Sequence, residues 1–324
     1  MSKHLFSTAS VFALILAGQA IANDSSISQI GALHSATVDQ TAGNEGVSSI
    51  EQIGEGNTVT VTQTDAPPQG IPNFNTAANT STVLQDGEGA VATVNQTGDP
   101  FESPGNESEI TQFSDGVNIT EADVAQSGAN NFSSIEQGRD VDPLDRSGQV
   151  ATVTQDGLDH ISTIEQKGNL NTANVTQSME GNTSAISQIG ADNNADVLQS
   201  GIGNFSTITQ SASFGTADVE QSGNNNSSEI TQSGSVNSSV AGLVLQSGND
   251  NTSIITQTST VPARQQMAEV TQSTDGNFSE ITQGGDTGTP AVSMNVATVM
   301  QTVTGNNTSV ITQAGAGNTS TVNQ

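Results

Sequence analysis

The chain of 324 residues contains no cysteine, tryptophan or tyrosine, and its aromatic content is only 3%. Without cysteine it can form neither a disulfide nor a zinc site of the Cys/His type, and it has no thiol nucleophile. Since only 32% of its residues are hydrophobic, composition alone favours disorder over a large packed core. Any ordered fold must therefore draw its stability from a regular pattern that needs only a narrow core.

Positive charge is also scarce, because 33 acidic residues face only five lysines and arginines. Such an acidic surface repels phosphate backbones, which makes nucleic acid a poor partner. Catalytic signatures are missing as well, since we find no persuasive Ser/His arrangement and no metal-ligand cluster in the sequence. We therefore expect a protein that is not an enzyme and needs no cofactor.

What the chain does contain is a repeat. Between His160 and Gln232 a glutamine recurs every eleven residues without interruption: Gln166, Gln177, Gln188, Gln199, Gln210, Gln221 and Gln232. The positions two, four and six residues before each glutamine are restricted, and the residues between them vary. A restriction of period two is typical of a β-strand with one buried face. Glycine often follows two residues after the glutamine, as at Gly168, Gly190, Gly201, Gly223 and Gly234, and predicts a turn with positive φ.

Two kinds of strand alternate along the chain. One kind reads N-x-S-x-I-x-Q and the other x-x-A-x-V-x-Q, so the period is about 22 residues. The pattern predicts an all-β fold, a β-solenoid of about twelve stacked two-strand rungs. The expected core and ladder positions of its most regular part are Asn182, Ser184, Ile186, Gln188, Ala195, Val197, Gln199, Asn204, Ser206, Ile208, Gln210, Ala217, Val219 and Gln221.

The alternation also predicts how the core packs. If the two strands of a rung run in opposite directions, isoleucine of one faces alanine of the other, and serine faces valine. Large residues opposite small ones keep a dense core at one width. The asparagine and glutamine columns are expected at the margins of this core, where side-chain amides can bond to their copies in neighbouring rungs.

Residues 1–22 are predicted to be a secretory signal peptide. Lys3 precedes an apolar run from Val11 to Ala17, and the segment ends in Ala20-Ile21-Ala22, a small-residue cleavage site. The alternative, a membrane anchor, requires an apolar run nearer 20 residues, so we expect no membrane insertion. The repeat region is then 23–324, and all eight prolines fall in five predicted loop insertions, at 64–78, 97–105, 138–148, 258–265 and 284–294.

The spacing of glutamine, glycine, asparagine and the apolar position, as in Gln199, Gly201, Asn204, Ser206, Ile208 and Gln210, resembles the curlin repeat of bacterial curli fibre subunits. The resemblance covers the chain after residue 22. It implies a secreted subunit that polymerises into extracellular amyloid fibres at the cell surface, for biofilm matrix and surface adhesion. It also implies a second curli-type subunit as nucleator and an outer-membrane secretion channel as partners, although this chain has twelve rungs where such subunits typically carry about five repeats.

Both ends of the repeat region are expected to act in self-assembly, because no capping segment is apparent there and an open strand edge is a template for another strand. The residues concerned are Asn23, Ser25, Ile27 and Gln29 at one end and Asn318, Ser320, Val322 and Gln324 at the other.

Other interpretations of the same features stay open. A monomeric β-solenoid adhesin is the closest alternative to a fibre. An ice-binding face is less favoured, because T-x-T triplets such as Thr207-Ile208-Thr209 fall in distant rungs, and a polysaccharide-cleaving β-helix would need a cleft with clustered acids. Acidic turns such as Asp192 and Asp250 could bind calcium, although the calcium-binding G-G-x-G-x-D repeat is absent. The N-x-[ST] triplets and His160, which takes the place of an asparagine, are interpreted as products of the repeat.

Overall fold

The computed structural model describes residues 23–41, 46–65, 78–99, 104–116, 118–138, 148–234, 239–259, 265–284 and 294–324. The predicted signal peptide lies outside these residues, as do most of four predicted insertions and residues 100–103 of the fifth, 97–105. The described residues contain strands and turns and no helix, and so no helix long and apolar enough to cross a membrane occurs among them. The chain divides into two compact units, Met1–Gln149 and Val150–Gln324.

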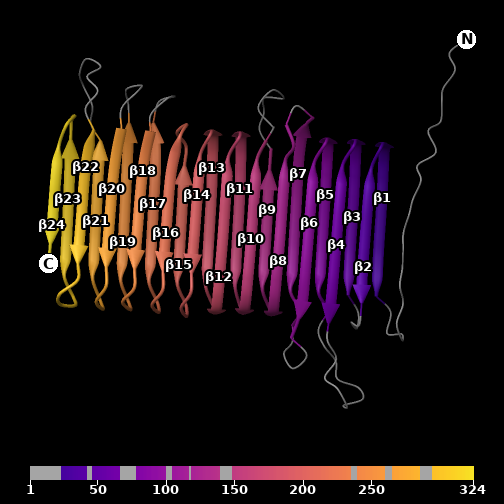
Figure 1. Ribbon diagram of the computed structural model, residues 1–324, viewed down its shortest axis with the longest axis horizontal. Helices are drawn as coiled ribbons and strands as arrows, with labels where there is room; N and C mark the ends of the chain where they lie inside the picture. Colours follow the sequence, from indigo (N-terminus) through magenta and orange to yellow (C-terminus); the bar gives the residue numbers. More distant parts are fainter. Residues whose placement is uncertain are drawn as a thin grey trace, which may run out of the picture. The chain divides into compact units, whose positions relative to one another are not determined.

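Unit 1 is built from parallel strands in two sheets (Figure 1). One sheet has the order β1-β3-β5-β7-β9 and the other β2-β4-β6-β8, so consecutive strands alternate between the sheets. The strands are β1 (Asp24–Ala32), β2 (Ser35–Thr41), β3 (Val47–Glu55), β4 (Thr58–Asp65), β5 (Thr80–Glu88), β6 (Val91–Gly98), β7 (Glu107–Asp115), β8 (Glu121–Ala129) and β9 (Phe132–Gln137).

Unit 2 repeats this plan. Its sheets have the orders β11-β13-β15-β17-β19-β21-β23 and β10-β12-β14-β16-β18-β20-β22-β24. The strands are β10 (Val150–Leu158), β11 (Ile161–Asn169), β12 (Thr172–Glu180), β13 (Thr183–Ala191), β14 (Asn194–Gln199), β15 (Phe205–Gln210), β16 (Gly215–Gln221), β17 (Ser227–Gly234), β18 (Ser239–Gln246), β19 (Thr252–Ser259), β20 (Gln265–Gln272), β21 (Phe278–Gly284), β22 (Asn295–Gln301), β23 (Thr308–Ala314) and β24 (Thr319–Asn323).

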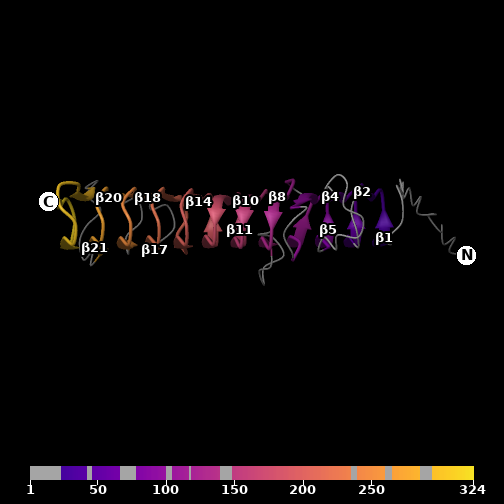
Figure 2. The ribbon, with the colours of Figure 1, turned by 90° about the horizontal axis from the view of Figure 1, so that it is seen from below.

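The predicted solenoid is thereby confirmed. Each pair of consecutive strands makes one turn of the coil, and the 24 strands correspond to about twelve rungs with two strands each. Figure 2 shows the thin double layer that results within each unit. Odd-numbered strands carry the Ser/Ile pattern and even-numbered strands the Ala/Val pattern, so each sheet is built from one class of repeat.

The strands pair in register, position on position. Ile186 of β13 lies beside Ile164 of β11 and Ile208 of β15, and the glutamines align in the same way. This register continues past the insertions, since Gln63 pairs with Gln96 although 33 residues separate them. The strand bounds extend slightly into the predicted insertions, because Thr64 and Asp65 belong to β4 and Thr97 and Gly98 to β6.

The core is one side chain thick from each sheet. In the interior strands the isoleucines of the odd sheets and the alanines and valines of the even sheets are almost completely buried, with Ile208, Ala217 and Val219 at 0% exposure. At Gly242, which replaces an alanine of the pattern, an added Cβ would lie 3.0 Å from Cγ2 of Ile230. The isoleucine column therefore faces the alanine column, as the alternation of large and small residues predicts.

The glycines that follow each glutamine have the predicted positive φ at Gly168 and Gly190 and not at the other three positions. Gly168 has a φ of +98°, but Gly201 is not in the positive-φ region. What both share is close stacking, because an added Cβ would lie 2.0 Å from the Gly190 carbonyl oxygen at Gly168 and 1.8 Å from the Gly223 carbonyl oxygen at Gly201. The prediction of positive φ is wrong at Gly201, Gly223 and Gly234, where the approach of the next turn excludes a side chain.

We predict that Ile208→Asp destabilises unit 2 by more than the ~2–5 kcal/mol typical of truncating a buried isoleucine, because it places an unpaired carboxylate in a core without a charged partner. Thr207→Asp is the matched control, since its side chain points out of the same strand. Urea unfolding of both variants at neutral pH measures the difference. Equal losses of stability would contradict the assignment of inward and outward faces.

Candidate assembly surfaces: amide ladders and sheet edges

The glutamines form continuous ladders along both sheets of each unit. In each ladder Nε2 of one glutamine donates to Oε1 of the next glutamine in the sheet, at 2.7–3.1 Å. Unit 1 contains the ladders Gln29-Gln52-Gln85-Gln112-Gln137 and Gln40-Gln63-Gln96-Gln126. Unit 2 contains Gln166-Gln188-Gln210-Gln232-Gln257-Gln283-Gln313 and Gln155-Gln177-Gln199-Gln221-Gln246-Gln272-Gln301-Gln324.

The interior amides also connect the two sheets. The second N–H of Gln188 donates to the Thr172 carbonyl of the facing sheet at 2.9 Å, and Gln210 does the same to Asn194. With two donated bonds and one accepted bond, the amide of an interior glutamine is satisfied despite its burial, and the orientation of its oxygen and nitrogen is fixed. The ladder therefore links rung to rung and sheet to sheet with one side chain.

The asparagines behave differently from the prediction. Oδ1 of Asn182 accepts the backbone N–H of Asn204 at 2.9 Å, and its Nδ2 donates to the carbonyls of Ser178 and Gly201. The expectation of asparagine ladders between side chains is wrong at these positions, although Asn131 and Asn106 do share such a bond. The shorter side chain lies where the strand turns, and there it satisfies backbone groups that the sheet leaves unpaired.

His160 replaces asparagine in this column. It is 0% exposed, its Nδ1 accepts the backbone N–H of Asn182 at 3.3 Å, and its Nε2 lies 3.4 Å from the Asp156 carbonyl oxygen. The ring thus accepts one bond and donates one, as Asn182 does with its Oδ1 and with one of its N–H groups, in the neutral form with the proton on Nε2. Burial lowers the pKa of His160 below its ordinary value of 6.5, although Asp156 and Asp159 oppose the shift.

The serines of the core are less well satisfied than the amides. Ser184, Ser206 and Ser228 are buried, and their hydroxyls find no hydrogen-bond partner among the described residues. A buried hydroxyl without a partner costs about 1–3 kcal/mol. Serine at these positions therefore contributes small volume opposite the larger column, and its hydroxyl weakens the core.

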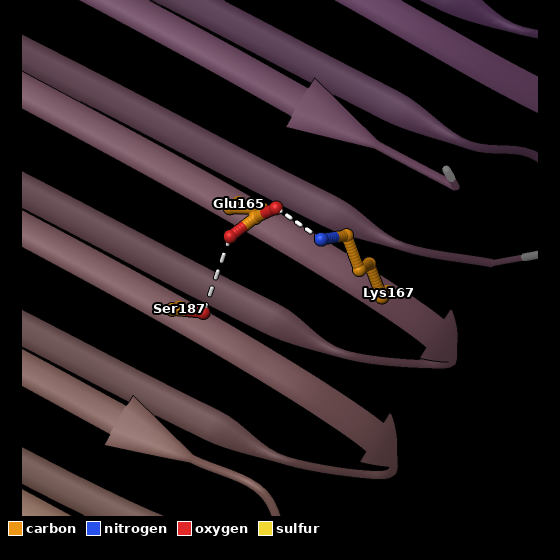
Figure 3. Close-up of polar contacts among 3 residues, drawn as sticks. All are labelled: Glu165, Lys167 and Ser187. Atoms are coloured by element: carbon orange, nitrogen blue, oxygen red, sulfur yellow. Dashed lines mark hydrogen bonds and ion pairs between the residues drawn. The ribbon is translucent and has the colours of Figure 1, made fainter. Parts of the chain in front are cut away.

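The outer faces are acidic in both units. In the described part of the chain the one ion pair joins Lys167 and Glu165, and Glu165 also accepts a bond from Ser187 of the next odd strand at 3.4 Å (Figure 3). Acidic side chains elsewhere stack on each other, as Asp218 does beside Asp196. Partial burial, with Asp196 and Glu220 nearby, raises the pKa of Asp218. No group of three or more possible metal ligands occurs among the described residues.

Threonines form one outer column without forming paired arrays. Thr209, Thr231, Thr256, Thr282 and Thr312 stack in register along the odd sheet of unit 2. The neighbouring outward column contains Glu229 and Glu280 in the same strands, so the T-x-T triplet at Thr207 and Thr209 has no copy in the adjacent strand β17. The array that an ice-binding face would require is not repeated there.

The sheet edges carry the residues predicted for self-assembly. Ser25, Ile27 and Gln29 lie in β1 and Asn23 directly precedes it, and all four are partly exposed. The copies of the three strand residues in β3, which are Ser48, Ile50 and Gln52, are at most 1% exposed. Asn318, Ser320 and Val322 on β24 are partly exposed and Gln324 is exposed. Among the described residues each of these two edges has a strand on one side only.

Comparison with known families agrees with this geometry. The model of the curlin associated repeat matches residues 190–223 and 223–258. Two curlin associated repeats therefore lie within residues 190–258. The two matched curlin repeats lie within unit 2, and the same in-register strands and glutamine ladders extend over the rest of that unit and over unit 1. The comparison with curated proteins gave no significant match.

We predict that Gln210→Leu lowers the stability of unit 2 by about 1–3 kcal/mol, because it leaves the Gln188 donor and the Gln232 acceptor side of the ladder unpaired. Ser206→Ala in the same strand removes a hydroxyl without a partner, and we expect it to leave stability unchanged or raise it. Urea midpoints of the two variants test this contrast. A loss of stability in Ser206→Ala as large as in Gln210→Leu would show that the serine hydroxyls are bonded.

His160→Asn should make the stability of unit 2 less sensitive to acid. Because the pKa of His160 is lowered by folding, the unfolded chain binds the proton more tightly, so stability is complete above about pH 6.5 and falls as the pH drops below it. Asparagine makes the same bonds without titrating. Urea unfolding at pH 7 and at pH 5 measures the difference, and an unchanged pH dependence in the variant would contradict the role of the neutral ring.

Proposed function

We propose that this chain is a structural subunit of an extracellular curli-like fibre and has no enzymatic activity. The proposal rests on the curlin repeats, the stacked solenoid and above all one observation, the partly exposed core and ladder residues of the edge strands β1 and β2 at one end and β24 at the other. Burying these residues against the strands of another copy would complete both the core and the ladders, which is the driving force for addition.

The wider biology follows from this proposal. The predicted signal peptide would direct the chain to the periplasm, and a curli-type outer-membrane channel would release it at the cell surface. A second curli-type subunit would nucleate growth there, and the fibres would serve as biofilm matrix and as an adhesive surface. A monomeric adhesin on the same solenoid is the competing function.

Fibre diffraction and electron microscopy of the purified chain lacking residues 1–22 test the proposal. We expect unbranched fibres that form without a cofactor and give reflections near ~4.7 Å and ~10 Å, the spacings between strands and between sheets. Ile208→Asp is the control that should fail to give ordered fibres. A chain that stays monomeric for days at micromolar concentration would support the adhesin instead.

Assembly should be slowed by the acidic faces. In-register stacking places like charges about 4.8 Å apart, as at Asp196 and Asp218, and described residues supply only Lys167 to offset them. We predict that the lag of dye-monitored assembly shortens with added salt, which screens charges over about 10 Å at 0.1 M, and as pH falls toward carboxylate pKa values near ~4. Asp218→Asn should shorten the lag at neutral pH, and a lag that lengthens with salt would exclude repulsion as the cause.

A further inference from the structure

The glutamine ladders have a direction. In all four ladders the Nε2 donor belongs to the earlier strand and the Oε1 acceptor to the later strand, from Gln29 and Gln52 in unit 1 to Gln283 and Gln313 in unit 2. The direction is fixed by the second bond that interior amides make, such as Gln52 to the Ser35 carbonyl and Gln283 to the Met267 carbonyl. If oxygen and nitrogen of such an amide were exchanged, two acceptors would face each other. Each unit is therefore polar along its stack.

The two free edges consequently present opposite groups. On β1 and β2, Oε1 of Gln29 and of Gln40 receives no hydrogen bond from any described residue, while their Nε2 atoms donate inward to Gln52 and Gln63. On β23 and β24, Oε1 of Gln313 and Gln324 is occupied by inward bonds. Their Nε2 atoms donate to the facing carbonyls of Val296 and Thr308, which leaves one N–H of each amide for a further rung.

We propose, building on the fibre function above, that copies of this chain join only head to tail, with the β23/β24 edge of one copy as donor and the β1/β2 edge of the next as acceptor. The register would place Ile311 beside Ile27 and Gln313 beside Gln29 in the odd sheets. In the even sheets it would place Val322 beside Val38 and Gln324 beside Gln40. The ladders and both apolar columns then continue through the joint without a change of class.

A head-to-head joint cannot do this. Two copies related by a two-fold axis across the stack would bring their edge strands together antiparallel, so a glutamine would face the asparagine end of the opposing strand. Two acceptor oxygens would also remain buried without donors, at about 1–3 kcal/mol for each group. The polarity of the amides thus selects one of the possible joints and makes the two ends of a fibre chemically different.

Because the chain has no cysteine, introduced cysteines and disulfide trapping can determine which edges meet at the joint. Ser26 and Val310 are exposed and stand at the centre of the outward faces of β1 and β23. In the head-to-tail joint they are in-register neighbours about 4.8 Å apart, within the Cα separation that a disulfide spans. In an antiparallel joint of two β1 edges, Ser26 of one copy would instead oppose Ser26 of the other.

The experiment mixes two single variants, Ser26→Cys and Val310→Cys, under reducing conditions, lets fibres form and then oxidises them. We expect the mixed dimer as the main cross-linked product, at least about tenfold above either homodimer. The pair Thr37→Cys and Thr321→Cys in the even sheets should also give mainly the mixed dimer. Thr37→Cys with Val310→Cys is the control for which no cross-link is expected, because the two residues lie in different sheets.

The outcomes separate the two proposals. Absence of fibres in wild type and variants would overturn the proposed function. Fibres with Ser26 homodimers, or fibres without any cross-link in the two matched pairs, would leave the fibre function standing and overturn the head-to-tail joint.

A second variant tests the amide polarity itself. Gln324→Glu keeps the acceptor oxygens that receive Gln301 and Ser309 but removes the N–H donors at the open edge. Asn323→Asp adds the same charge on the exposed outer side of β24 without touching the ladder. We expect elongation of preformed wild-type seeds to slow at least about tenfold with Gln324→Glu and far less with Asn323→Asp. Equal rates for the two variants would contradict a donor role for this edge.

Discussion

The hydrogen bond from one glutamine amide to the next is the interaction on which the rest of this structure depends. It holds strands in register, since a shift by one residue would expose every glutamine and bury an outward side chain. The same interior amides join the sheets, because their second N–H donates across the core to the facing backbone. Chains of such bonds strengthen each other in a low-dielectric interior, which is how a protein with few large apolar residues holds an ordered fold.

The apolar columns determine the thickness of the coil, and the glutamine amides determine the register of its strands. Isoleucine opposite alanine keeps the core at constant width, and the shortest side chains lie where the facing residue is longest. At the turns, asparagine bonds to backbone groups, and glycine allows successive turns to stack within contact distance. Each type of residue in the repeat thus solves one packing or hydrogen-bonding problem, and the problem is the same in every rung.

Much of this could be predicted from the sequence because the repeat presents each constraint many times. The position of Gln210 two residues after Ile208, found again in all rungs but the one with Val83, establishes strand, face and register together. The alternation of classes predicts two sheets. What could not be predicted are features that depend on distances between turns. The sequence shows glycine at position 201 but gives no sign that the Gly223 carbonyl excludes its side chain, and it cannot show that Asn182 bonds to backbone while Gln188 bonds to its own copy.

The strict alternation of strands has a consequence for how such a chain can change its length. Removing or inserting two consecutive strands, for example β13 with β14, leaves both outer edges with the same residues, classes and amide direction as before. Removing a single strand would stack a Ser/Ile strand on an Ala/Val strand at the deletion, with isoleucine on valine and serine on alanine, and would move every later strand into the other sheet. Recombination between repeats can therefore lengthen or shorten the protein in steps of about 22 residues while its contact surfaces stay constant, so chain length can evolve independently of assembly chemistry.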